Sequence, residues 1–250
     1  MIGVIASREW KSLFLSLLAW SVLGVIQLIL AWIFLAQIDT FLQVQSRLAG
    51  MEGAPGLTDL IATPLFGAAV TFLMLLTPLL TMRLISDELR NGTFSLLLTA
   101  PVSMTQIVLG KYLGFMGFIA VSLGLTLLMP LSLLIGGSLD FGKLAAALLG
   151  LFLATASFAA VGLFISSLTA QPAIAAIGTY GVLLFFWIIN LAAETGEQSG
   201  RLFNWLSLQS HYEFMMRGLI RTSDLIYYLL LIAAFLLLTI RRLDNRRRED

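Results

Sequence analysis

Six long apolar stretches dominate the sequence and limit what the chain can fold into. Each is close to the length of a helix that crosses the ~30 Å hydrocarbon core of a bilayer, which takes ~20 mostly apolar residues. Because lipid offers the backbone no hydrogen-bond partners, such a segment must satisfy its own amide groups, as a helix does. We therefore expect an all-α integral membrane protein with six transmembrane helices. The predicted spans are residues 17–38, 61–84, 107–135, 144–168, 172–193 and 225–240.

The composition of the chain argues against a soluble enzyme. Hydrophobic residues make up 59% of its 250 residues and charged residues only 12%, whereas a soluble domain is about 25% charged. With no cysteine and a single histidine, His211, neither disulfides nor a zinc site are expected. The sequence also lacks a Gly-x-x-x-x-Gly-Lys-Ser/Thr phosphate-binding loop. We predict no catalytic residue and no metal on this chain, and no nucleic-acid partner.

Positive charge is distributed unequally between the two ends of the predicted bundle. With the N-terminus in the cytoplasm, ten of the 15 Lys and Arg residues fall on the cytoplasmic side, which is the usual bias of membrane proteins. The pattern predicts that both termini are cytoplasmic. The ten residues are Arg8, Lys11, Arg83, Arg90, Lys111, Arg241, Arg242, Arg246, Arg247 and Arg248.

Two segments outside the spans have the pattern of surface helices. Residues 1–16 gather apolar side chains on one side and polar ones, such as Arg8 and Lys11, on the other, which predicts an interfacial helix. It is interpreted as a charged anchor or as an elbow helix along the cytoplasmic surface. Residues 196–224 alternate apolar and charged groups and are expected to form short outer helices, as a cap on the bundle or a substrate contact. Their polar candidates are His211, Glu213, Arg217 and Asp224.

The cytoplasmic segment between the second and third spans concentrates charged and turn-forming residues. Ser86 is expected to cap a short helix that begins with two acidic residues. Gly92 is expected to end this helix or to let another backbone come close. Thr93 is expected to cap a second short helix over residues 94–99. Such a charged helix at the membrane surface is either a docking element for a partner's groove or an ordinary charged loop.

Two separated motifs in the chain resemble those of a known family. The first is Thr81-Met-Arg83 … Asp87-Glu88 … Asn91-Gly-Thr93 … Leu96-Leu-Leu-Thr-Ala-Pro101-Val … Val108-Leu-Gly-Lys111, and the second is Ser210-His-Tyr-Glu-Phe … Arg217-Gly-Leu-Ile … Asp224-Leu-Ile-Tyr-Tyr-Leu with a basic tail. With the six-span layout, they resemble the ABC-2 type permeases, the membrane subunits of ATP-driven exporters. The likeness is closest to the gliding-motility-type branch.

The resemblance implies a complex in the bacterial inner membrane. Two permease copies would pair as a homodimer, and each would dock on a cytosolic ATPase that binds ATP and Mg²⁺, with no cofactor on this chain. Residues 196–224 would correspond to re-entrant helices before the last span. A membrane-anchored protein with an extracytoplasmic domain often accompanies this branch. The implied ATPase-coupling residues are Arg83, Asp87, Glu88, Arg90, Asn91, Gly92 and Thr93.

The polar and small residues within the spans favour structural roles. Their cores contain no ionisable side chain, although ion-coupled transporters commonly place one at membrane depth; this favours an ATP-driven system. Hydroxyls such as those of Thr77 and Thr155 are expected to bond their own backbone or a neighbouring helix, and not a substrate. Gly110, Gly114 and Gly117 are expected to allow close approach of another helix.

Two alternatives to an exporter permease stay open. A membrane enzyme would need a nucleophile near His211 and Glu213, and none is evident. A scaffold that transmits ATP-driven force to an extracytoplasmic partner would have the same sequence features. The tail, residues 241–248, is interpreted as a topology anchor attracted to anionic lipid, with ATPase contact as a second possibility.

Overall fold

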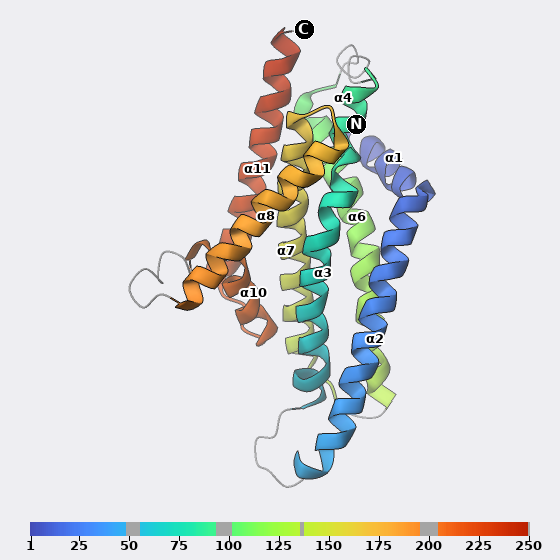
Figure 1. Cartoon of the computed structure of the whole chain (residues 1–250), viewed down its shortest axis with the longest axis vertical. Coiled ribbons are helices and arrows are strands. Elements are labelled where there is room, and N and C mark those ends of the chain that lie inside the picture. Colours follow the sequence, from blue (N-terminus) through green and yellow to red (C-terminus); the bar gives the residue numbers. More distant parts are fainter. Residues whose placement is uncertain (49–55, 94–101, 136–137, 196–204, 250) are drawn as a thin grey trace.

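The computed structural model describes residues 1–48, 56–93, 102–135, 138–195 and 205–249, and every regular element in these ranges is helical (Figure 1). A π-helical stretch, Thr58–Ala62, precedes α3, and a 3₁₀ turn, Ser132–Ile135, follows α6. The helices in chain order are α1 (Ile2–Leu15), α2 (Leu17–Leu48), α3 (Thr63–Thr81), α4 (Arg83–Arg90), α6 (Met104–Leu131), α7 (Phe141–Leu168), α8 (Pro172–Thr195), α10 (Leu208–Met216) and α11 (Thr222–Glu249).

Six helical segments in the described part of the chain are long and apolar enough to cross a membrane, by length and composition. They fall on the six predicted spans, but several helices extend further. The 32 residues of α2 measure about 48 Å at 1.5 Å per residue, well beyond a ~30 Å hydrocarbon core. Likewise, α11 begins at Thr222 and continues to Glu249. The predicted spans therefore underestimate the lengths of these helices, because a helix need not end where the hydrocarbon core gives way to the headgroups.

Local sequence signals set several helix ends. Ser103 and Gln106 form a reciprocal capping box at the start of α6, which satisfies amides that the first turn leaves unpaired. The Asp140 carboxylate accepts a hydrogen bond from the Lys143 amide, at 3.0 Å, where α7 begins. The α-helical part of the third span ends at Leu131, directly after Pro130, and the 3₁₀ turn follows it.

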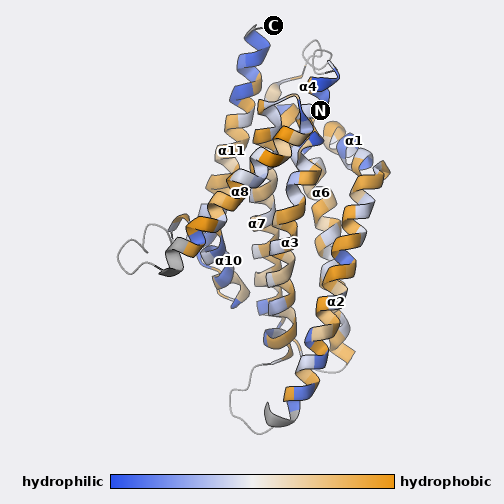
Figure 2. Ribbon diagram, viewed as in Figure 1, coloured by the Kyte–Doolittle hydropathy of each residue, from blue (hydrophilic) through white to orange (hydrophobic). Residues whose placement is uncertain are grey.

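Helix α7 forms the centre of the bundle. In its apolar segment 72% of the residues are buried, against 22–39% in the other five. Helices α3, α6, α8, α10 and α11 all contact α7, whereas α2 lies outside α3 and α6 and exposes Leu28, Trp32 and Leu35. Figure 2 shows apolar residues along the length of the bundle and polar residues concentrated near its ends. Exposed apolar side chains of this kind suit contact with lipid.

Both termini lie at the same end of the bundle as α4, which we call the α4 end (Figure 1). Helix α10 lies in the half of the bundle away from α4. Lys143 and Asp59 form an ion pair at the opposite end. This arrangement agrees with an even number of spans.

The predicted structural roles of the span hydroxyls are confirmed. The Thr77 hydroxyl donates to the Leu73 carbonyl at 2.6 Å, and the Thr155 hydroxyl donates to the Leu151 carbonyl at 2.8 Å. Both bonds lie within one helix and one turn. Such hydroxyls are already satisfied by their own backbone, so they need no substrate or neighbouring helix.

Candidate functional site

Helix α4 follows α3 in the chain and lies at the end of the bundle that holds both termini (Figure 1). The two helices are separated by a break at Met82. The break leaves the first amides of α4 without partners from their own helix. Ser166 of α7 provides the partner: its hydroxyl oxygen accepts from the amides of Ile85 at 3.1 Å and Ser86 at 3.0 Å, and its hydroxyl donates to the Met82 carbonyl at 3.0 Å. One serine therefore connects α4 to the central helix.

The expectation that Ser86 caps the charged helix is wrong. The helix begins three residues earlier, at Arg83, and Ser86 lies buried within it. Its hydroxyl donates back to the Met82 carbonyl, as a serine inside a helix does when no free amide is in reach. A serine before two acidic residues is the pattern of a helix N-cap. Here, however, the helix already includes the residues before Ser86, from Arg83 onward.

A close approach between α3 and α7 holds the same junction. Gly162 of α7 faces the Thr81 side chain, and a Cβ added at Gly162 would lie only 2.1 Å from the Thr81 Oγ1. Only glycine permits this separation of the two backbones. Gly162 and Ser166 are one turn apart on α7, so they contact α3 and α4 on either side of the Met82 break.

Lys111 links three helices at the α4 end. Its ammonium lies 2.8 Å from the carboxylate of Glu9 on α1 and 2.7 Å from that of Glu88 on α4. The side chain of Lys111 is 3% exposed, and those of Glu9 and Glu88 are 14% and 18% exposed. A buried ammonium requires charged partners of this kind. We call Glu9, Glu88 and Lys111 the charged triad; Arg8 and Arg83 line the same cleft.

Helix α1 packs directly along α6 through a row of glycines. A Cβ at Gly110 would lie 2.7 Å from Ile5, and one at Gly114 would lie 2.7 Å from the Ala6 carbonyl. A Cβ at Gly117 would approach the Trp10 ring at 3.2 Å. The predicted close approach at these three glycines is thus confirmed, and the partner is α1. The row places Glu9 beside Lys111.

The coupling residues predicted from sequence divide into two groups. Arg83, Asp87 and Arg90 line a groove of about 690 Å³ between α4 and the residues that join α7 to α8, with Gln171 and Pro172 on its other side. Glu88 instead points to Lys111 within the charged triad. Arg90 therefore lines only the outward groove, Glu88 belongs to the internal ion pair, and Arg83 and Asp87 line both the groove and the cleft of the charged triad.

The end of α4 has the predicted turn. The Asn91 amide donates to the Asp87 carbonyl at 3.0 Å, and Gly92 has a φ of +69°, a left-handed conformation that favours glycine. The Thr93 hydroxyl donates to the Glu88 carbonyl at 3.4 Å, and all three residues are exposed. The second helix predicted over 94–99 lies outside the described residues.

The polar candidates of residues 205–224 do not form one site. His211 and Asp224 are both buried, with the His211 Nδ1 2.7 Å from the Asp224 Oδ1. The His211 Nε2 lies 3.1 Å from the Trp205 carbonyl, and its ring stacks on Tyr227. By contrast, Glu213 is half-buried and Arg217 exposed, and the structure describes no ion pair for either.

The His211–Asp224 pair fastens α10 to α11. The two ring nitrogens of His211 thus contact two different acceptors, the Asp224 carboxylate at Nδ1 and the Trp205 carbonyl at Nε2. The Tyr228 hydroxyl adds a 2.8 Å bond to the Leu208 carbonyl, and burial raises the pKa of the Tyr212 hydroxyl, which donates to the Phe66 carbonyl of α3 at 2.9 Å. The Ser223 hydroxyl also donates to the Asp224 Oδ1, at 3.4 Å. Together these contacts suit a structural connection between α10 and its neighbours.

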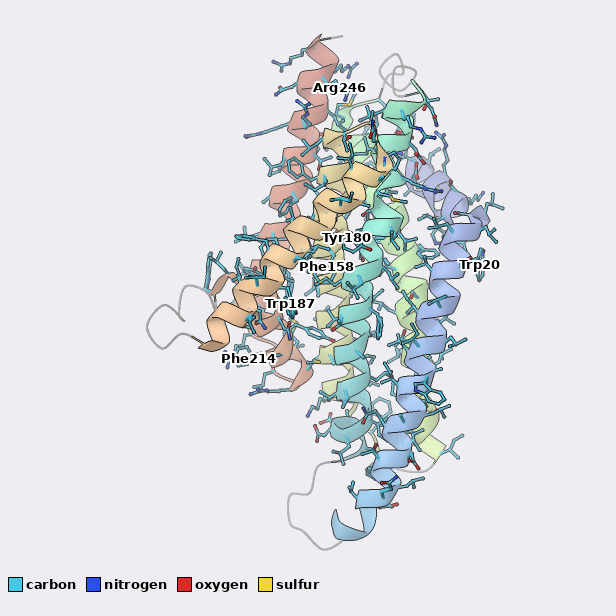
Figure 3. All side chains as sticks on the ribbon, viewed as in Figure 1. Trp20, Phe158, Tyr180, Trp187, Phe214 and Arg246 are labelled. Atoms are coloured by element: carbon cyan, nitrogen blue, oxygen red, sulfur yellow. The ribbon has the colours of Figure 1, made fainter. Side chains whose placement is uncertain are left out.

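A small, mostly apolar cavity of about 110 Å³ is lined by residues of α3, α7, α8 and α10. Met74 of α3, Phe158 of α7 and Trp187 of α8 are among its lining residues, with Gln209 and Tyr212 on the α10 side. Figure 3 shows Phe158 and Trp187 in the same region of the bundle.

Sequence reasoning missed Glu9, Lys111, Gly162 and Ser166 as parts of this site. A signal for Glu9 existed, because it lies four residues after Ile5 and four before Leu13 on the apolar side of α1. A carboxylate on an apolar helix face needs a partner. Nothing local marks Ser166, whose partners lie about 80 residues earlier.

The helices define an all-α, multi-pass membrane protein with a charged helix at the end that holds both termini. A family model described as ABC-2 family transporter protein matches residues 4–248, nearly the whole chain. The chain therefore belongs to this family, whose members are membrane components of transport systems and generally work with a separate ATPase subunit. Compared with functionally curated proteins, the sequence has no significant match.

Proposed function

We propose that the chain is the permease of an ATP-driven ABC-2 type exporter in the bacterial inner membrane, of the gliding-motility-type branch. The α4 end faces the cytoplasm, where a separate ATPase subunit binds ATP and Mg²⁺. Two copies of the chain pair, and a protein with an extracytoplasmic domain accompanies them. The groove lined by Arg83, Asp87 and Arg90 is the docking surface for the ATPase.

The observation that supports this most directly is the Ser166 connection between α4 and α7. A flexible loop would move under an applied force without moving the helices. Helix α4 is instead held to the bundle by direct contacts. Ser166 and Gly162 hold the α3–α4 junction to the central helix, and Lys111 ties Glu88 to α1 and α6. Movement of α4 would therefore shift several helices together as a rigid body.

The test is to purify the tagged chain gently from its own host and to quantify the ATPase chain that accompanies it. Reversing Asp87 and Arg90 (Asp87→Arg with Arg90→Glu) keeps the net charge and should remove the ATPase. Glu88 is a poor choice for this test, because its reversal also disrupts the internal ion pair with Lys111. Arg217→Glu, on an exposed residue away from α4, is the control and should retain the ATPase.

Purification without an ATPase in several mild detergents, with the permease intact, would overturn the proposal. If the ATPase is present, its activity distinguishes export from the force-transmitting scaffold. Stimulation by a transported substrate in reconstituted vesicles indicates export. Stimulation by an extracytoplasmic partner domain alone indicates force transmission.

A further inference from the structure

The C-terminal end of α11 extends past the other described helices at the α4 end (Figure 1). The helix continues without a break from Thr222 to Glu249. Leu243 is fully buried in the hydrophobic core, so α11 still packs on its neighbours at that level. Beyond Leu243 the helix presents polar residues only, and Figure 3 shows Arg246 on this projecting part.

The helical register divides the arginines of this segment into two groups. Residues three and four apart share a face of a helix. Thr239 and Leu243 are both fully buried, and Arg246 and Arg247 continue their stripe. The opposite face carries Arg241, Asn245 and Arg248, which are all exposed. Arg246 and Arg247 therefore point over the end of the bundle, whereas Arg241 and Arg248 point away from it.

The position of the inward pair along the helix limits its contact with lipid. Arg246 and Arg247 follow the first arginine, Arg241, by five and six residues, which is about 8–9 Å along the axis. The headgroup layer on one side of a bilayer is only about 5–7 Å thick. In the described part of the chain neither arginine forms an ion pair, including with the nearby Asp244.

We propose that Arg246 and Arg247 form a second contact for the cytosolic ATPase, in addition to the groove on α4, by binding an acidic patch on its surface. The inference rests on the proposed function. The two unpaired guanidinium groups lie beyond the headgroup layer and over the end of the bundle where α4 lies, and guanidinium groups bind carboxylates bidentately. Arg241, the first arginine of the segment, contacts anionic lipid headgroups, so only part of the tail is a lipid anchor.

The absence of cysteine from the chain permits a direct test by cross-linking. Single cysteines replace Arg247 on the inward face, Arg241 on the outward face at the level of the headgroups, and Asn91 on α4. Each is labelled with a benzophenone maleimide in native membranes and irradiated, and adducts are identified by mass spectrometry. We expect Arg247→Cys and Asn91→Cys to cross-link to the same ATPase chain, and Arg241→Cys to cross-link mainly to lipid.

The cross-linking experiment distinguishes failure of the inference about α11 from failure of the proposed function. If Asn91→Cys cross-links to the ATPase while Arg247→Cys gives only lipid adducts, the inference about α11 is wrong and the proposed function stands. If neither position gives an ATPase adduct in membranes that contain the ATPase, the docking surface on α4 falls as well.

Charge reversal measures the strength of the contact. The inward double variant Arg246→Glu/Arg247→Glu should weaken ATPase association roughly tenfold and reduce its dependence on salt, as loss of a charged contact does. The outward double variant Arg241→Glu/Arg248→Glu makes the same change in net charge and should weaken ATPase association by less than about twofold. Equal effects of the two variants on association would overturn the assignment of the inward face, provided that both are recovered as monodisperse protein.

Discussion

The ammonium of Lys111 lies 2.7 Å from the carboxylate of Glu88, although the two residues belong to different helices and Lys111 is almost fully buried. The pair fixes the inner side of α4, and Glu9 joins it from α1 at 2.8 Å. The outer side of α4 is thereby left to the groove lined by Arg83, Asp87 and Arg90. One side of α4 is thus held to the bundle by an ion pair, and the other side is available to a partner.

Lys111→Met should destabilise the protein strongly, because it leaves two carboxylates mostly buried beside each other without a cation. Removal of one member of a buried ion pair costs about 3–5 kcal/mol, and partial exposure of Glu9 and Glu88 places the expected loss at the lower end. Thermal unfolding in detergent measures it. Adding Glu9→Gln and Glu88→Gln to the variant should recover much of the stability, and failure to recover would show that charge is not the cause.

Ser166→Ala should destabilise the junction between α3 and α4 by about 1–3 kcal/mol, because the amides of Ile85 and Ser86 lose their shared acceptor. Ser167 provides a matched control. It is equally buried, but its hydroxyl donates only to the Phe164 carbonyl of its own helix. Ser167→Ala should therefore change the unfolding temperature little, and equal shifts in the two variants would contradict the role of Ser166.

Gly162→Ala should lower stability by about 1–3 kcal/mol, since the added methyl group overlaps the Thr81 side chain and forces the helices apart. The companion substitution Thr81→Ala removes part of the overlap and should restore part of the loss. Gly124 in α6 has no heavy atom within 4 Å of an added Cβ, so Gly124→Ala should be neutral or slightly stabilising. Thermal unfolding of Gly162→Ala, of Gly162→Ala with Thr81→Ala, and of Gly124→Ala tests the contact.

His211→Leu should loosen α10 from α11, because it leaves the Asp224 carboxylate buried without its partner. Hydrogen exchange of residues 208–216 should rise well above that of the unchanged protein, while exchange in α7 stays low. Glu213→Leu removes an ionisable group two residues away that has no described ion pair, and it should leave exchange unchanged. Similar protection of α10 in both variants would show that the His211–Asp224 pair does not hold this helix.

The sequence predicts the spans well, because crossing a membrane requires long apolar stretches that stand out in any window. It also predicts close packing at Gly110, Gly114 and Gly117, since three glycines at helical spacing leave a flat face. It does not predict which helix lies on that face. The partner is α1, whose amphipathic pattern is equally typical of a helix that lies free at the membrane surface.

Local signals mislead where distant residues decide the structure. The Ser86 pattern predicts a helix start, but Ser166 of α7 satisfies the backbone there and lets the helix begin at Arg83. The position of Lys111 near the start of a span suggests a simple interfacial cation. Its burial between two carboxylates depends on contacts with residues 102 and 23 positions away, and no pattern within one helix contains that information.

The docking of α1 on α6 has a consequence for biosynthesis. Glu9 leaves the ribosome well before its partner Lys111, which is made 102 residues later. During that interval two apolar spans enter the bilayer while the first helix has no groove to occupy. The growing chain must therefore keep its amphipathic leading helix at the water–lipid boundary, and completion of the third span is the earliest moment at which the amino-terminal part of the structure can close.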